Sequence, residues 1–281
     1  MKVFLTGSTG FIGTNLRLLF LDKGYEVGCY KRGDDVTSSL QAFSPDMVVN
    51  CAAEIYEPSS MFTPNVVLVQ EILEYVRSCR PQAKVVHLGS SSEYGPVGRP
   101  TREDDPIRPV DMYQATKGAA TLLCQGYARQ YDLDVVIVRP YSVYGQHERP
   151  HRLFPRLVRA FVAEERMTLH HGCHDFIHID DFCRGVFMVA FVGPHRGDIF
   201  NLGSGVQVSN AEVLDLFVNE SHLQAPPSNI TVTQSYAKAF ESDVWVCDTT
   251  LAATRLHFKP EIPLREGIRR LLLAAQNVND C

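Results

Sequence analysis

The first two dozen residues constrain the fold more than any other part of the chain. An apolar run, Lys2–Leu5, leads into the turn GSTGFIG, whose glycines are Gly7, Gly10 and Gly13, and a helical pattern then continues to Leu21. Glycine allows a tight turn, close approach of the backbone to a pyrophosphate, and close packing of helix on strand. The start of the helix adds free N–H groups and a partial positive charge. This succession predicts a dinucleotide-binding unit, the alternative being a turn that serves the fold alone.

Strands and helices alternate through the first half of the chain. Apolar patterning predicts further strands at 26–30, 47–50, 84–88 and 134–138, and helices at 66–80 and 113–131. This order predicts an α/β fold, in which a Rossmann-type, doubly wound parallel sheet is covered by helices on both faces.

The regular alternation of strands and helices ends after Gly145. Longer helices are expected at 153–164, 181–192, 210–220 and 264–275, with short strands at 167–170, 176–179 and 200–202. We therefore expect a dinucleotide-binding domain at 1–145, to which 175–202 partly returns. Residues 146–174 and 203–281 are expected to form a smaller, partly interleaved C-terminal substrate lobe.

Composition and charge limit the classes of partner that the chain is expected to bind. The chain carries a formal net charge of −5 and no long basic run, which disfavours nucleic acid. Its longest apolar stretches, such as GVFMVAFVG, are too short to span a bilayer, and its beginning does not have the pattern of a signal peptide. The eight cysteines show no CxxC pairing and are interpreted as reduced thiols of a cytoplasmic protein.

The end of the second strand bears on the cofactor. Tyr30 is followed by Lys31 and Arg32, whereas an acidic residue at this place would bind the ribose 2′-hydroxyl of NAD. Two cations suit a 2′-phosphate, because arginine can engage phosphate through two donors. The pair favours NADP (NADPH), with NAD as the alternative if these charges belong only to a solvated loop.

A tyrosine and a lysine lie four residues apart in DMYQATKG. Tyr113 and Lys117 are expected on one face of a helix, one turn apart. An ammonium beside a phenol lowers the phenol pKa, so Tyr113 is a candidate to donate or accept a proton near neutral pH. The plain alternative is a surface tyrosine that happens to have a lysine nearby.

The stretch HHGCHDFIH gathers histidines and a cysteine. Its spacing does not recur elsewhere, and strand alternation would send successive side chains to opposite faces. We therefore predict no metal site. Three arginines, Arg152, Arg156 and Arg159, lie at helical spacing and would face either a diphosphate or solvent.

Several motifs follow one another in an order that resembles a known family. GSTGFIG, PDMVVNCAA, GSSSEYG, YQATK, VRPYSVYG, HDFIHIDD and NLGSG together resemble the extended short-chain dehydrogenase/reductase family, in its nucleotide-sugar epimerase, dehydratase and reductase branch. The resemblance covers nearly the whole chain. It implies an NAD(P)-dependent enzyme that acts on a nucleotide-diphosphate sugar, and a homodimer formed through the helices at 66–80 and 113–131.

The resemblance also assigns roles to residues. Counting back four residues from Tyr94 gives Ser90, which would hydrogen-bond the substrate oxygen while Tyr113 transfers a proton and Lys117 holds the nicotinamide ribose. The expected cofactor contacts are Gly7, Thr9, Gly10, Phe11, Ile12, Gly13, Tyr30, Lys31, Arg32, Ala52, Ala53, Leu88, Lys117 and Pro140.

The same comparison separates the possible reactions. Ser91 and Ser92 stand where 4,6-dehydratases of the family carry an acidic pair, and serine has no comparable basicity. His147 matches one acid/base residue of an epimerising pair, but Ser92 stands in place of the cysteine that completes it. We expect an NADPH-dependent reductase of a 4-keto, 6-deoxy nucleotide sugar. The alternatives are a 4-epimerase with tightly bound NAD, a 4,6-dehydratase and a non-catalytic NADP-binding protein.

The expected substrate contacts lie mostly in the second half of the chain. Ser142 replaces the usual asparagine of the family and His174 an arginine, so both indicate an altered sugar or diphosphate pocket. The full set is Ser91, Ser92, Tyr141, Ser142, His147, Arg149, Arg152 and His174.

Overall fold

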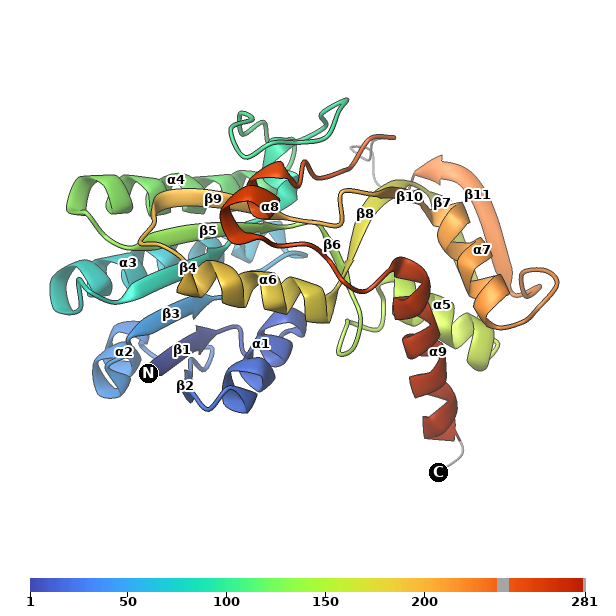
Figure 1. Cartoon of the computed structure of the whole chain (residues 1–281), viewed down its shortest axis with the longest axis horizontal. Coiled ribbons are helices and arrows are strands. Elements are labelled where there is room, and N and C mark those ends of the chain that lie inside the picture. The colour runs from blue at the N-terminus through green and yellow to red at the C-terminus, as the bar shows by residue number, and fades with distance from the viewer. Residues whose placement is uncertain (237–242, 280–281) are drawn as a thin grey trace.

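A computed structural model of the protein describes residues 1–236 and 243–279 (Figure 1). Its central sheet has six strands in the order β2-β1-β3-β4-β5-β9, and all neighbouring pairs are parallel. The strands are β1 (Lys2–Thr6), β2 (Glu26–Cys29), β3 (Met47–Asn50), β4 (Lys84–Leu88), β5 (Val135–Pro140) and β9 (Arg196–Leu202). The predicted Rossmann-type parallel sheet is confirmed.

Helices cover both faces of this sheet (Figure 1). One face is packed against α1 (Phe11–Asp22), α6 (Ile179–Phe191) and α8 (Thr250–Leu256). The opposite face is packed against α2 (Val36–Phe43), α3 (Leu68–Cys79) and α4 (Met112–Tyr131). Each inner strand is therefore apolar on both sides, as parallel sheets require.

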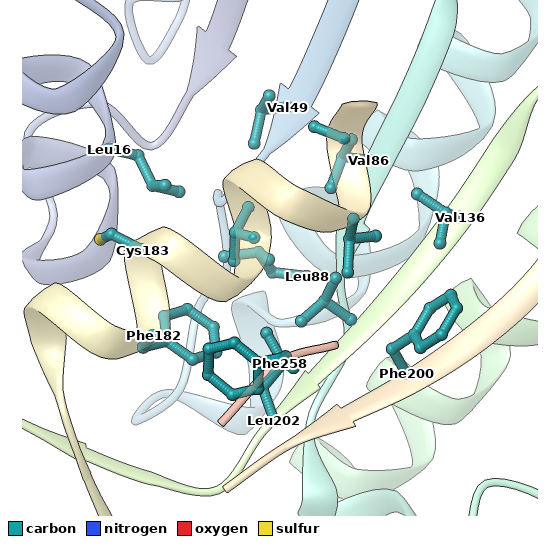
Figure 2. Packing of buried hydrophobic residues seen from close by; sticks show 14 of the residues in the cluster. Leu16, Val49, Val86, Leu88, Val136, Phe182, Cys183, Phe200, Leu202 and Phe258 are labelled. Atoms are coloured by element: carbon teal, nitrogen blue, oxygen red, sulfur yellow. The ribbon is translucent and has the colours of Figure 1, made fainter. Parts of the chain in front are cut away.

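The larger core lies between the sheet and helices α1 and α6. Figure 2 shows Leu16 of α1 and Phe182 of α6 gathered with Val86 of β4 and Phe200 of β9. Phe258, which follows α8, belongs to the same cluster. The segment around α8 thus contributes to this core, although patterning alone groups it with the C-terminal lobe. The helix is short, and its apolar residues are buried only because the chain returns to cover β9.

The second lobe is built from helices α5 (Leu153–Val162), α7 (Asn210–Glu220) and α9 (Leu264–Asn279) with two small sheets (Figure 1). One sheet has the order β10-β8-β6, from Gln207–Ser209, Cys173–His178 and Ser142–Tyr144. The other pairs β11 (Ile230–Tyr236) with β7 (Met167–His171). Tyr144 stacks on Phe154 at 4.2 Å in the core of this lobe. Because β6 follows β5 directly, the lobe lies beyond the carboxyl end of the central sheet.

Candidate active site

The glycine turn closes tightly between β1 and α1. Gly7 has a φ of +64°, and its carbonyl accepts a 2.9 Å hydrogen bond from the Gly10 amide. A Cβ on Gly13 would lie 2.1 Å from the Gly7 oxygen, so only glycine fits there. Among the described residues no side chain caps α1, and its first turn holds no acidic residue. The amides of that turn are therefore available to an anion such as a pyrophosphate.

The predicted cofactor residues lie along one edge of the sheet. The sheet order reverses at β1, and the crevice at such a switch point is where ligands bind in open α/β sheets. Thr9, Phe11 and Ile12 belong to the turn and first residues of α1. The remaining contacts follow the carboxyl ends of the strands: Tyr30, Lys31 and Arg32 after β2, Ala52 and Ala53 after β3, Leu88 on β4 and Pro140 on β5.

The two cations after β2 are exposed. The side chain of Arg32 is 82% exposed, and its Nη2 lies 3.4 Å from Glu54 Oε2. Sequence reasoning missed Glu54, whose carboxylate also accepts hydrogen bonds from the Tyr56 and Ile55 amides. These amide hydrogen bonds, the one from Tyr56 first, lower the pKa of Glu54 despite its partial burial.

Asn65 joins the cofactor edge to the helix that carries Tyr113. Its amide oxygen accepts from the Glu54 amide at 2.8 Å, and its Nδ2 donates to the Glu54 carbonyl at 2.9 Å and to Thr116 Oγ1 at 3.0 Å. The side chain is 1% exposed. The loop after β3 and the first turns of α4 are thus held in fixed relation.

The serine run forms a short 3-10 helix, η3 (Ser91–Tyr94), directly after β4. Ser90 is its N-cap: the Ser90 hydroxyl accepts from the Ser92 amide at 3.2 Å and contacts the Ser92 hydroxyl at 2.7 Å. The Glu93 carboxylate accepts from the Ser90 amide at 2.7 Å and completes a capping box. The local sequence therefore fixes the Ser90 hydroxyl at the carboxyl end of β4.

Glu93 points into the protein interior, and its side chain is 0% exposed. Its carboxylate accepts from Thr121 Oγ1 at 2.8 Å and pairs with the Arg139 guanidinium at 2.7 Å. The Arg139 guanidinium also lies over the Tyr94 ring, 4.2 Å from its centre. A carboxylate held in this way supports the turn and is not available as an acid or base for a ligand.

Tyr113 and Ser90 are brought together as predicted from the resemblance. The Tyr113 phenol lies close enough to the Ser90 side chain for that side chain to act on the pKa of the phenol. Burial raises the pKa of Tyr113, and the Ser90 side chain opposes this shift only in part. The expectation that Lys117 lowers this pKa is not met. The Lys117 ammonium instead donates to the Leu88 carbonyl, and burial lowers its own pKa.

The predicted substrate residues divide into two groups. Ser91, Ser92 and Tyr141 lie close to the Ser90 turn, where Ser91 and Tyr141 line one small pocket. Ser142 of β6 meets His174 of β8, with 3.4 Å between Ser142 Oγ and His174 Nδ1. The two positions that depart from the family pattern are therefore neighbours in space.

Asp175 holds the strand next to this pair in place. Its buried carboxylate accepts from the Ser204 amide and hydroxyl at 2.6 Å each, from the Gly205 amide at 2.9 Å and from the Cys247 amide at 3.0 Å. These bonds connect the HDFIHIDD and NLGSG motifs. Sequence reasoning used both motifs as family markers but did not find this connection.

The other predicted substrate residues lie on the loop 145–152, which reaches from the second lobe to the cofactor edge. Asn15 of α1 donates to the Gln146 carbonyl at 3.0 Å, and Tyr56 Oη meets His151 Nε2 at 2.5 Å. The Arg149 guanidinium lies 5.3 Å from the centre of the Tyr56 ring. His147 is exposed and has a φ of +69°.

Within residues 1–236 and 243–279, no cluster of histidine, cysteine and acidic side chains has the arrangement of a metal site. The seven cysteines in these ranges are free thiols, and Cys281 lies outside them. No helix in the described part of the chain is long and apolar enough to cross a membrane.

Comparison with known proteins places this geometry in a family. Residues 3–203 match the model of the NAD dependent epimerase/dehydratase family. The chain belongs to this family. The match confirms the resemblance to extended short-chain dehydrogenases/reductases and the expectation of an NAD(P)-dependent, oxidoreductase-type enzyme.

Individual relatives within the family cover almost the entire chain. A dTDP-6-deoxy-L-talose 4-dehydrogenase (NAD(P)(+)) of Kitasatospora kifunensis is 29% identical, over 97% of this chain and 95% of that protein. A UDP-glucose 4-epimerase of Mycolicibacterium smegmatis is 27% identical, over 96% of this chain and 97% of that protein. The solved structure of MoeE5 with UDP-glucuronic acid and NAD is similar over 99% of this chain and 100% of that chain, at 25% identity and a TM-score of 0.88.

Proposed function

We propose that the protein reduces the 4-keto group of a nucleotide-linked 6-deoxy sugar with NADPH. The observation that carries the proposal is the Tyr113 phenol, which lies beside the Ser90 side chain and whose pKa is raised by burial, so that it is protonated at neutral pH. A protonated phenol suits the reductive direction, in which the carbonyl oxygen gains a proton.

Each residue of the site has a role in this reaction. The bound nicotinamide would supply the hydride to C4. The Ser90 hydroxyl would stabilise the negative charge that develops on the carbonyl oxygen, and Tyr113 would donate its proton to that oxygen. Lys117 would hold the nicotinamide ribose from its place beside the Leu88 carbonyl.

The neighbouring side chains argue against dehydration. Ser91 and Ser92 cannot remove a C5 proton, and the Glu93 carboxylate is paired with Arg139 in the interior. The similarity to a dTDP-6-deoxy-L-talose 4-dehydrogenase supports the proposal, because oxidation at C4 of a 6-deoxy nucleotide sugar is the reverse of the proposed reduction.

The loop 145–152 favours a second candidate, a 4-epimerase that retains NAD. Its contacts with Asn15 and Tyr56 join the second lobe to both sides of the cofactor edge and would slow cofactor exchange. An epimerase needs such retention, because it returns the hydride to the same sugar. The similarity to a UDP-glucose 4-epimerase agrees with this candidate.

The nucleotide released from freshly purified, denatured protein separates the two candidates. Identification by mass of stoichiometric NAD would favour the epimerase and contradict the reductase. An empty site, or NADP, would support the reductase. Oxidation of NADPH in the presence of 4-keto sugar nucleotides would then be measured directly.

A further inference from the structure

Glu148 is a buried acid that neither the motifs nor the proposed reaction uses. It lies in the loop 145–152, and its side chain is 4% exposed. One carboxylate oxygen lies 3.5 Å from Arg152 Nε, and the other is buried without a hydrogen-bond partner among the described residues. Burying a carboxylate costs free energy when one of its oxygens has no hydrogen-bond partner. The presence of Glu148 at this buried position therefore requires an explanation.

The partner of Glu148 connects it to the active site. Arg152 is the N-cap residue of α5, and its side chain is 50% exposed. Its positive charge acts on Tyr113 and opposes the rise in the pKa of the phenol. Arg152 therefore pairs with a buried carboxylate, lies close enough to Tyr113 to act on its pKa, and has half of its side chain exposed to solvent.

Other charged or titratable groups surround this pair. Tyr144 of β6 faces Glu148, and its hydroxyl is also buried without a partner in the described part of the chain. Behind Tyr144 lie Asp181 of α6 and Glu266 and Arg270 of α9. Among the residues that the structure describes, Arg152 is the cation that forms an ion pair with Glu148.

We propose that Glu148 is a positioning residue, which holds the Arg152 guanidinium near Tyr113 and competes there with an anionic group of the substrate. The inference rests on the proposed function, in which the substrate carries a diphosphate. When Glu148 is ionised it neutralises part of the charge of Arg152. When Glu148 is protonated, the guanidinium attracts the diphosphate with its full charge.

Burial gives this competition a pH dependence in the physiological range. It raises the pKa of Glu148 to about 7, and the charge of Arg152 opposes the shift only in part. An anion bound at Arg152 would favour the protonated acid. Binding should therefore weaken as the pH rises through 7 and should take up protons near that pH.

Isothermal titration calorimetry of the NADPH-saturated protein tests this inference. The probes are UDP-glucose, dTDP-glucose and GDP-mannose, whose diphosphate diesters keep a constant charge from pH 6 to 8.5 and which carry no ketone to reduce. For the probe that binds, we expect the Kd of the wild type to rise roughly threefold to tenfold over this range. Titrations at pH 7.5 in buffers of different ionisation enthalpy should show proton uptake.

Three variants complete the experiment. Glu148→Gln should abolish both the pH dependence and the proton uptake, and Arg152→Gln should weaken binding at every pH. Glu165→Gln is the matched control, because Glu165 pairs with Arg159 at 2.7 Å beside the same helix but is exposed. It should behave as the wild type does.

Two results would overturn the inference, and they are distinguishable. The same pH dependence in wild type and Glu148→Gln would overturn the positioning role alone. If the wild type bound none of the three probes at any pH, the proposed nucleotide-sugar function would fail and the inference with it.

Discussion

The Glu93 carboxylate lies 2.7 Å from the Arg139 guanidinium, and their side chains are 0% and 1% exposed. The Glu93 carboxylate also accepts hydrogen bonds from the Ser90 amide and the Thr121 hydroxyl. One buried carboxylate thus ties the turn that presents Ser90 to α4 and to β5. The positions of Ser90 and Tyr113 relative to each other depend on this connection.

Replacing Glu93 by glutamine should be strongly destabilising. The amide cannot neutralise Arg139, and an unpaired buried guanidinium costs about 3–5 kcal/mol. Urea denaturation would measure the loss. The matched control is Glu74→Gln, which breaks a more exposed, solvent-screened pair with Arg77 and should destabilise the protein far less. Similar losses in the two variants would contradict a structural role for the buried pair.

Tyr113→Phe should remove NADPH-dependent ketone reduction and leave the Kd for NADPH nearly unchanged. The substitution deletes the proton donor beside Ser90 but keeps the ring, and general acid catalysis contributes about 10²–10⁴-fold. Turnover would be followed by NADPH absorbance and cofactor binding by fluorescence. Tyr131→Phe, at the other end of α4, should retain full activity. Substantial turnover by Tyr113→Phe would refute the assignment of Tyr113.

Local patterning predicted much of the sheet, because each inner strand is apolar on both faces. The bounds of β3, β4 and α7 agree with the prediction to the residue. The helix expected at 66–80 instead begins with a π-helical turn at Thr63–Val67 and continues as α3. Helix α2 was missed because it is short, although Asp35 caps it by accepting from the Ser38 amide.

The site could be predicted only where a motif of the family marks its residues. The proximity of Ser90 to Tyr113 followed from the resemblance of two such motifs. The contact between Ser142 and His174, and the pairing of Glu148 with Arg152, depend on how the second lobe folds onto the first. No periodicity or spacing reports such contacts, since they join residues whose neighbours in sequence are unrelated.

Arg32→Ala should weaken the binding of NADPH but not the binding of NADH. An exposed guanidinium at the end of β2 would bind the 2′-phosphate, and charged hydrogen bonds of this kind contribute about 1.5–3 kcal/mol. The Kd for NADPH should therefore rise at least about tenfold, while that for NADH changes little. Lys23→Ala, which removes an exposed cation after α1, is the control. An equal change for both cofactors would argue against a 2′-phosphate site.

A homodimer through α3 and α4 is testable by a single charge. Leu122 on α4 is 59% exposed. If it lies at the dimer interface, a glutamate in its place would bury an unpaired carboxylate, which costs free energy. Leu122→Glu should convert a dimer to a monomer in sedimentation analysis. Leu18→Glu changes a leucine on α1 that is 46% exposed and should leave the mass unchanged. A wild type that sediments as a monomer would refute the dimer.

Glu148→Gln should stabilise the protein at pH 8 and not at pH 4.5. The pKa of Glu148 is raised from 4.5 to about 7 in the folded state, so between these values the folded protein holds a proton that the unfolded chain has released. The contribution of Glu148 to stability therefore falls as the pH rises from about 4.5 to 7 and stays low above 7. Glutamine removes this loss, a gain on the order of 2–3 kcal/mol at pH 8.

Thermal unfolding of both proteins at several pH values would measure this difference. The extra stability of Glu148→Gln over the wild type should grow as the pH rises from 4.5 to 7 and stay constant above 7. Only between these values do the folded and unfolded states differ in the protonation of Glu148. The exposed carboxylate of Glu165 provides the comparison, and Glu165→Gln should leave the pH profile of the wild type unchanged. A constant difference between wild type and Glu148→Gln at every pH would mean that Glu148 titrates normally. The buried oxygen without a partner would then have no consequence for the charge of Arg152.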